Sequence, residues 1–83
     1  MSRSDFTKRF AENLRRLRQE RGISQERLAD AAGLHRTHIS LIECDRRSVR
    51  LETLERLALA LGVEPAELVP PLLRKGARRD GSS

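Results

Sequence analysis

Apolar residues recur along most of this chain at intervals of three or four, the spacing that gathers them on one face of an α-helix. The first series has three members: Phe10, Leu14 and Leu17. It predicts a helix over about residues 5–21, capped at its start by Ser4 or Asp5 and ended by Gly22.

Two short helices joined by a tight turn are predicted next. Ser24 can cap the first of them, and Gly33 can end it after about two turns. Three residues form its inward stripe: Leu28, Ala29 and Ala32. The second short helix begins just after a buried Leu34 and ends near Glu43 or Cys44. Two core residues lie one turn apart on it: Ile39 and Ile42. This arrangement fits a helix-turn-helix motif.

The leucine-rich stretch that follows predicts two further helices. Five apolar residues mark the longer one: Leu51, Leu54, Leu57, Ala58 and Leu61. Gly62 ends it. A brief fifth helix opens at Glu64 and Pro65, where a missing N–H costs nothing, and the prolines at residues 70–71 stop it.

The composition agrees with an all-α fold in a single small domain. The 83 residues include no Trp or Tyr and only two Phe, so the core must be built mainly from Leu and Ala, as in packed helices. We expect residues 1–73 to form one compact five-helix domain. Residues 74–83 lack apolar periodicity and are expected to form a basic, disordered tail.

Several classes of protein are excluded on simple grounds. Cys44 is the only cysteine, so we expect neither an internal disulfide nor a zinc site, and a reducing cytoplasm fits. The longest apolar stretch, residues 57–61, is too short to cross a bilayer, and residues 1–6 lack the order of a secretory signal. We therefore expect a cytoplasmic protein without a cofactor or a membrane partner.

The net charge of +5 favours a polyanionic partner. The charge is also unevenly distributed. Residues 1–27 carry eight basic and four acidic groups, whereas residues 51–73 carry one basic group and four acidic ones. A partner with phosphates would therefore meet the amino-terminal half and the tail, and the acidic, leucine-rich stretch would face elsewhere.

The residues around the predicted turn resemble those of a known family. The runs ISQERLA at residues 23–29 and GLHRTHISLIE at residues 33–43 resemble the phage-repressor-like, Xre-type helix-turn-helix family. Together with Arg46 and Arg47, the second run is most similar to the controller proteins of restriction-modification systems. The resemblance spans about residues 10–69 and implies a lambda-repressor-like fold of five helices that binds double-stranded DNA.

One side of the third predicted helix is free to meet DNA if Ile39 and Ile42 point into the core. Five residues lie on that side or at its flanks: Arg36, Thr37, His38, Ser40 and Leu41. A recognition helix approaches the base edges with its amino end, so Arg36 and Thr37 are the leading candidates to read bases. Leu41 or the Thr37 methyl group could contact a thymine methyl.

Other residues are expected to hold the DNA backbone. The resemblance implies that Gln25, at the start of the second helix, contacts a phosphate. Three arginines in the loop after the recognition helix could bind phosphates or reach the minor groove: Arg46, Arg47 and Arg50. The resemblance also implies that Arg18 pairs with Glu43, which is a structural role.

Three positions depart from the family pattern. Asp45 stands where relatives usually have a glycine and tolerates a left-handed backbone less well than glycine does. Cys44 replaces a residue that is commonly polar. His38 stands where controller proteins often have a tyrosine, which puts any reading of DNA shape by that ring in doubt.

Simpler interpretations apply to several residues. Exposed arginines on an amphipathic helix usually form a solvated face, and this is the favoured interpretation for four of them: Arg15, Arg16, Arg21 and Arg27. His35 and His38 lie one turn apart but lack further metal ligands at a fitting spacing, so no metal site is expected. No nucleophile, base and orienter have a spacing that suggests catalysis, and a non-enzymatic protein is expected.

Surplus apolar residues in the acidic part predict a two-fold homodimer. Four residues are candidates for its interface: Leu59, Val69, Leu72 and Leu73. The alternative is that they complete the monomer core. The favoured function is a dimeric, sequence-specific transcription regulator that acts on a near-palindromic operator and blocks or recruits RNA polymerase. Two alternatives stay open: an antitoxin that also binds a toxin, and a helical interaction adaptor without DNA specificity.

Overall fold

The protein is built from α-helices, as the apolar periodicity predicts. The computed structural model describes residues 3–70, and no strand occurs in that range. Its five helices are α1 (Arg3–Glu20), α2 (Gln25–Ala32), α3 (Arg36–Glu43), α4 (Leu51–Leu61) and α5 (Pro65–Leu68). Leu72, Leu73 and the predicted tail at residues 74–83 lie outside the described residues.

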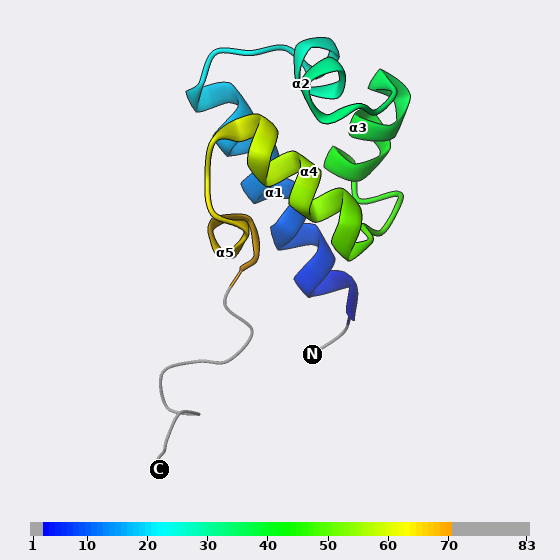
Figure 1. Cartoon of the computed structure of the whole chain (residues 1–83). Helices are drawn as coiled ribbons and strands as arrows, with labels where there is room; N and C mark the ends of the chain where they lie inside the picture. The colour runs from blue at the N-terminus through cyan, green and yellow to red at the C-terminus, as the bar shows by residue number, and fades with distance from the viewer. Residues whose placement is uncertain (1–2, 71–83) are drawn as a thin grey trace.

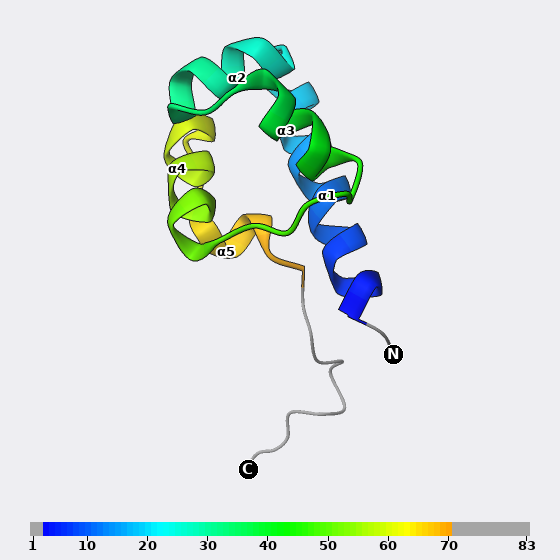
Figure 2. The same ribbon diagram turned by 90° about the vertical axis from the view of Figure 1, so that its right-hand side faces the viewer.

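The helices surround one core. Figure 1 shows α2 and α3 at one end of the molecule and α5 at the other, with the long α1 passing behind α4. In the view of Figure 2, α1 and α4 form opposite sides, and the segment between α3 and α4 crosses from one to the other. The helix-turn-helix formed by α2 and α3 therefore lies at the edge of the fold, held from behind by α1 and α4.

The core is aliphatic with one aromatic ring. Six large side chains have almost no exposed surface: Leu14, Leu28, Ile39, Ile42, Leu57 and Leu68. Phe10 and Leu17 of α1 extend this cluster, and Ala29 and Ala58 let the neighbouring helices approach closely. Every helix contributes to the core, so α3 is anchored by Ile39 and Ile42 to the rest of the domain.

Helices α1 to α4 end in the same backbone motif. In each case a residue with positive φ follows the helix, and the next N–H bonds back to a carbonyl five residues earlier, as in a Schellman motif. Glycine fills three of these positions, and Asp45, with φ +59°, fills the one after α3. The Arg46 N–H lies 2.8 Å from the Leu41 carbonyl. Asp45 thus adopts the conformation that glycine adopts after the other three helices.

Two local predictions were wrong. Helix α1 begins at Arg3, so Ser4 and Asp5 lie inside its first turn and do not cap it from outside. Leu34, expected to be buried, is only partly buried against the core.

Candidate nucleic-acid interface

Helix α3 presents its amino end to solvent. Arg36 and Thr37 are exposed, whereas His38, Ser40 and Leu41 are partly buried. No side-chain cap covers the start of the helix, since the His35 side chain at the N-cap position makes no capping hydrogen bond. Thr37, Ser40 and Leu41 thus lie on the side opposite the buried isoleucines, with Arg36 and His38 at its flanks, and the two leading candidates are the most accessible.

A buried ion pair fixes the other end of α3. Arg18 donates from Nε to Glu43 Oε2 at 2.6 Å and from Nη2 to Glu43 Oε1 at 3.1 Å. Arg18 also donates from Nη1 to the Ile23 carbonyl at 2.8 Å. Glu43 is 4% exposed. The forked geometry ties α1, the following loop and α3 together.

Gln25 joins the same network. Its Nε2 donates to Glu43 Oε1 at 3.0 Å, so the amide that the family resemblance assigns to a phosphate is also held from inside the protein. Gln25 is the first residue of α2, and Ser24 caps that helix by accepting a hydrogen bond from the Arg27 N–H at 3.0 Å. The amino end of α2 is therefore rigidly joined to the carboxyl end of α3.

Arg21 has a structural role that sequence reasoning missed. Its Nε donates to the Leu61 carbonyl at 2.6 Å and so satisfies a carbonyl in the last turn of α4. A solvated arginine was the expected interpretation. No spacing in the sequence links residues forty positions apart, so no signal was available. Arg16, in contrast, bonds within its own helix, to Glu20 and to Asn13.

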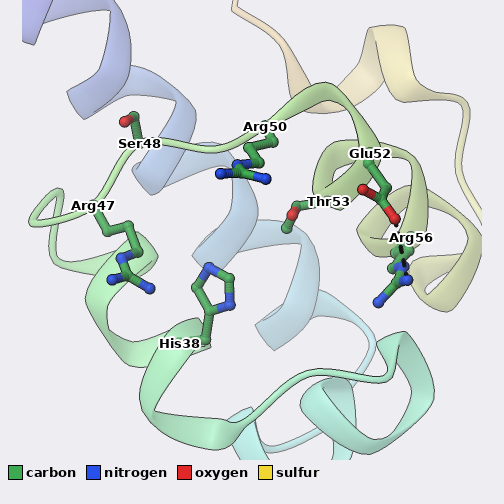
Figure 3. A pocket seen from close by; sticks show the side chains of 7 residues that line it. All are labelled: His38, Arg47, Ser48, Arg50, Glu52, Thr53 and Arg56. Atoms are coloured by element: carbon green, nitrogen blue, oxygen red, sulfur yellow. Dashed lines mark hydrogen bonds and ion pairs between the residues drawn. The ribbon is translucent and has the colours of Figure 1, made fainter.

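A basic pocket of about 480 Å³ lies between α3 and the start of α4 (Figure 3). Seven residues line it: His38, Arg47, Ser48, Arg50, Glu52, Thr53 and Arg56. Three of these, His38, Arg47 and Arg50, were predicted to contact DNA. Thr53 and Arg56 were not predicted to contact DNA, because the apolar periodicity of α4 indicates only the side of that helix that packs on the core.

The pocket has an excess of positive charge. Arg47, Arg50 and Arg56 face it, against the single carboxylate of Glu52. Glu52 Oε2 is 3.2 Å from Arg56 Nη2, so this carboxylate is directed to its own helix. Arg46 is not among the lining residues but is exposed beside the end of α3. The surface next to α3 can therefore hold an anion.

Other chemistries find little support in the described residues. Residues 3–70 contain no group of three or more His, Cys, Asp or Glu side chains that could hold a metal ion. Cys44 is exposed and free at the end of α3. Within the same range, no helix is both long enough and apolar enough to span a membrane.

Comparison with known proteins identifies the family. The family described as helix-turn-helix (HTH_3) matches residues 14–68. The chain belongs to the Xre-type helix-turn-helix family. The control protein C.SmaI of Serratia marcescens is 43% identical over 77 residues, which cover 92% of this chain and 87% of that protein. The control protein C.BamHI of Bacillus amyloliquefaciens is 43% identical over 61 residues, covering 72% and 75%.

Solved structures of this family share the fold. The restriction-modification controller protein C.AhdI of Aeromonas hydrophila superposes with a TM-score of 0.79 at 38% identity, over 82% of this chain and 99% of that one. The shared structure confirms the predicted fold class. Xre-type proteins are DNA-binding regulators rather than enzymes, which confirms the predicted non-enzymatic, DNA-binding function.

Proposed function

We propose that this regulator works in the cytoplasm as a homodimer that recognises a near-palindromic operator, in the manner of a restriction-modification controller protein. The observation that carries the proposal is the free amino end of α3, with Arg36 and Thr37 exposed beside a pocket rich in arginine. The similarity to C.SmaI and C.BamHI, both named control proteins, supports the controller assignment.

In this proposal α3 lies in the major groove and reads bases from its first turn. Arg36 forks onto a guanine, and Thr37 makes hydrogen bonds or contacts a thymine methyl. His38, Ser40 and Leu41, which are partly buried, supply further contacts from α3. The Arg18–Glu43 pair sets the direction of α3 and does not itself read DNA.

The backbone contacts come from both sides of α3. Gln25 offers a phosphate contact at the start of α2, where free N–H groups favour an anion. Three arginines supply the remaining contacts in the loop after α3: Arg46, Arg47 and Arg50. These contacts fix the position of the protein on the duplex but carry no sequence information.

The proposed dimer uses the apolar surface of the carboxyl-terminal half. Leu59 is 77% exposed on α4, and Val69 is partly buried, so neither is fully used by the core of the monomer. Leu72 and Leu73, which lie outside the described residues, complete the proposed interface. If the protein were an antitoxin, the acidic carboxyl-terminal half would bind the toxin; a contact with RNA polymerase is proposed without a location.

Selection of bound duplexes from random DNA tests the proposal directly. We expect two similar half-sites about one helical turn apart, related by a two-fold axis. A single asymmetric half-site would contradict the dimer but not the recognition by α3. Absence of any preferred sequence, with a weak dependence on salt, would favour the adaptor alternative.

A further inference from the structure

Helix α4 begins with unsatisfied backbone donors. It spans eleven residues, and its N-cap residue, Arg50, makes no side-chain capping bond. The first intrahelical bond runs from the Leu54 N–H to the Arg50 carbonyl at 2.9 Å. Within residues 3–70, no protein acceptor bonds to the N–H groups of Leu51, Glu52 and Thr53. These donors and the helix dipole favour a negative charge at this end.

Thr53 provides a second, independent observation. Its relative exposure is 9%, and its hydroxyl makes no hydrogen bond to any of the described residues. A buried hydroxyl without a partner destabilises the fold, so a ligand that accepts its hydrogen bond is favoured. Thr53 lines the basic pocket, and Figure 3 shows its side chain directed to the space between Arg50 and His38. The buried hydroxyl thus points to where a ligand would sit.

The charges around this space match an anion. Arg47 and Arg50 approach from the loop, and His38 approaches from α3 (Figure 3). The only carboxylate in the lining, Glu52, is paired with Arg56 on the outer side. A tetrahedral oxyanion could therefore accept hydrogen bonds from the helix N–H groups and from the Thr53 hydroxyl while two guanidinium groups neutralise its charge.

We propose that this pocket is a binding site for one phosphodiester group of the DNA backbone. The backbone N–H groups at the start of α4 and the Thr53 hydroxyl would hold the phosphate. The proposal rests on the proposed function, because the phosphate belongs to the duplex that α3 reads. The start of α4 thus contacts the phosphate from a helix, in addition to the contacts made by the arginines of the loop. A phosphate bound here would fix the distance between the backbone and α3, and hence the depth of α3 in the groove.

The decisive variant is Thr53→Val, which keeps the shape of the side chain and removes the hydroxyl. We expect the full-length variant to bind both its selected operator and an unrelated duplex about tenfold more weakly, as for a lost hydrogen bond to a charged group. Its thermal unfolding midpoint should equal or exceed that of the wild type, since an unpaired buried hydroxyl is removed. Thr53→Ser is the matched control and should retain most of the affinity.

Further outcomes distinguish failure of this phosphate-binding site from failure of the proposed function. Wild-type DNA affinity in Thr53→Val, or equal losses of affinity in Thr53→Val and Thr53→Ser, would overturn the phosphate-binding site. Base reading by Arg36 would be unaffected. Failure of the wild type to prefer any sequence would instead overturn operator recognition. The loss of affinity of Thr53→Val for non-specific DNA would still test the phosphate-binding site.

Amide chemical shifts distinguish DNA from free phosphate. A duplex should shift the N–H signals of Leu51, Glu52 and Thr53, and inorganic phosphate should shift the same signals only at much higher concentration. If inorganic phosphate binds these amides as tightly as the duplex does, the ligand is the free ion and the assignment to DNA is wrong. Unchanged signals on adding the duplex would also overturn the proposal.

Discussion

Glu43 and Arg18 form a forked ion pair across 25 positions of sequence, with the shorter contact, from Arg18 Nε to Glu43 Oε2, at 2.6 Å. The Arg18 side chain is 12% exposed and that of Glu43 only 2%. Both charged groups are therefore largely shielded from water, and each is stabilised mainly by the other. The pair couples the orientation of α3 to the long helix behind it.

Removing the carboxylate should therefore destabilise the domain strongly. We expect Glu43→Ala to lower the free energy of unfolding by about 3–5 kcal/mol, because it leaves the Arg18 guanidinium buried without a counter-charge. Urea denaturation of the variant and of the wild type measures this difference. The double variant Arg18→Met, Glu43→Leu should recover much of the loss. A single-variant loss below about 1 kcal/mol would contradict the buried-pair account.

Arg36 should affect specificity more than overall affinity. Arg36→Ala is expected to lose about 1–3 kcal/mol of binding free energy on the selected operator and much less on an unrelated duplex. Arg15→Ala, an exposed arginine on α1, is the matched control and should change neither greatly. Titrations at one fixed salt concentration make this comparison. Equal losses on both duplexes would show that Arg36 contacts a phosphate instead of a base.

Asp45 holds a backbone conformation that few side chains tolerate. With φ at +59°, Asp45→Val should destabilise the protein by about 1–3 kcal/mol. Asp45→Gly should leave stability within about 1 kcal/mol of the wild type, since relief of strain is offset by the entropy of glycine. Thermal denaturation followed by circular dichroism measures both. Equal destabilisation by valine and glycine would show that the carboxylate, rather than the backbone, is what matters.

Leu59 should be required for dimerisation but not for folding. Because its side chain is 77% exposed, Leu59→Asp should leave the helical circular dichroism signal unchanged while shifting the protein to monomer in sedimentation equilibrium. Gln19→Asp, another exposed position on a helix, should not shift it. A Leu59→Asp protein that remains dimeric at the same concentration would move the interface elsewhere.

The sequence predicts the helices well because their signals are local. Apolar spacing reveals the buried faces of α2 and α3, and glycine marks the ends of three helices. Asp45 shows where such signals weaken, since aspartate adopts positive φ only when the surrounding hydrogen bonds require it.

The unpredicted contacts join residues that are distant in sequence or depend on side-chain direction. Arg21 reaches the Leu61 carbonyl, and only the packing of α1 near the end of α4 makes this bond possible. Thr53 carries no pattern of its own in a leucine-rich helix, and its burial beside three arginines follows from the path of the loop before α4. The family resemblance supplied Arg18 and Glu43, which periodicity alone could not pair.

The single exposed thiol at the end of α3 makes the arrangement of two chains measurable. Since the sequence contains one cysteine, and Cys44 is exposed where the helix stops, a spin label attaches at one point per chain. Two chains bound to one duplex as the proposed dimer would then carry a matched pair of probes. The distance between the two labels in solution would then measure how far apart the two α3 helices lie along the DNA.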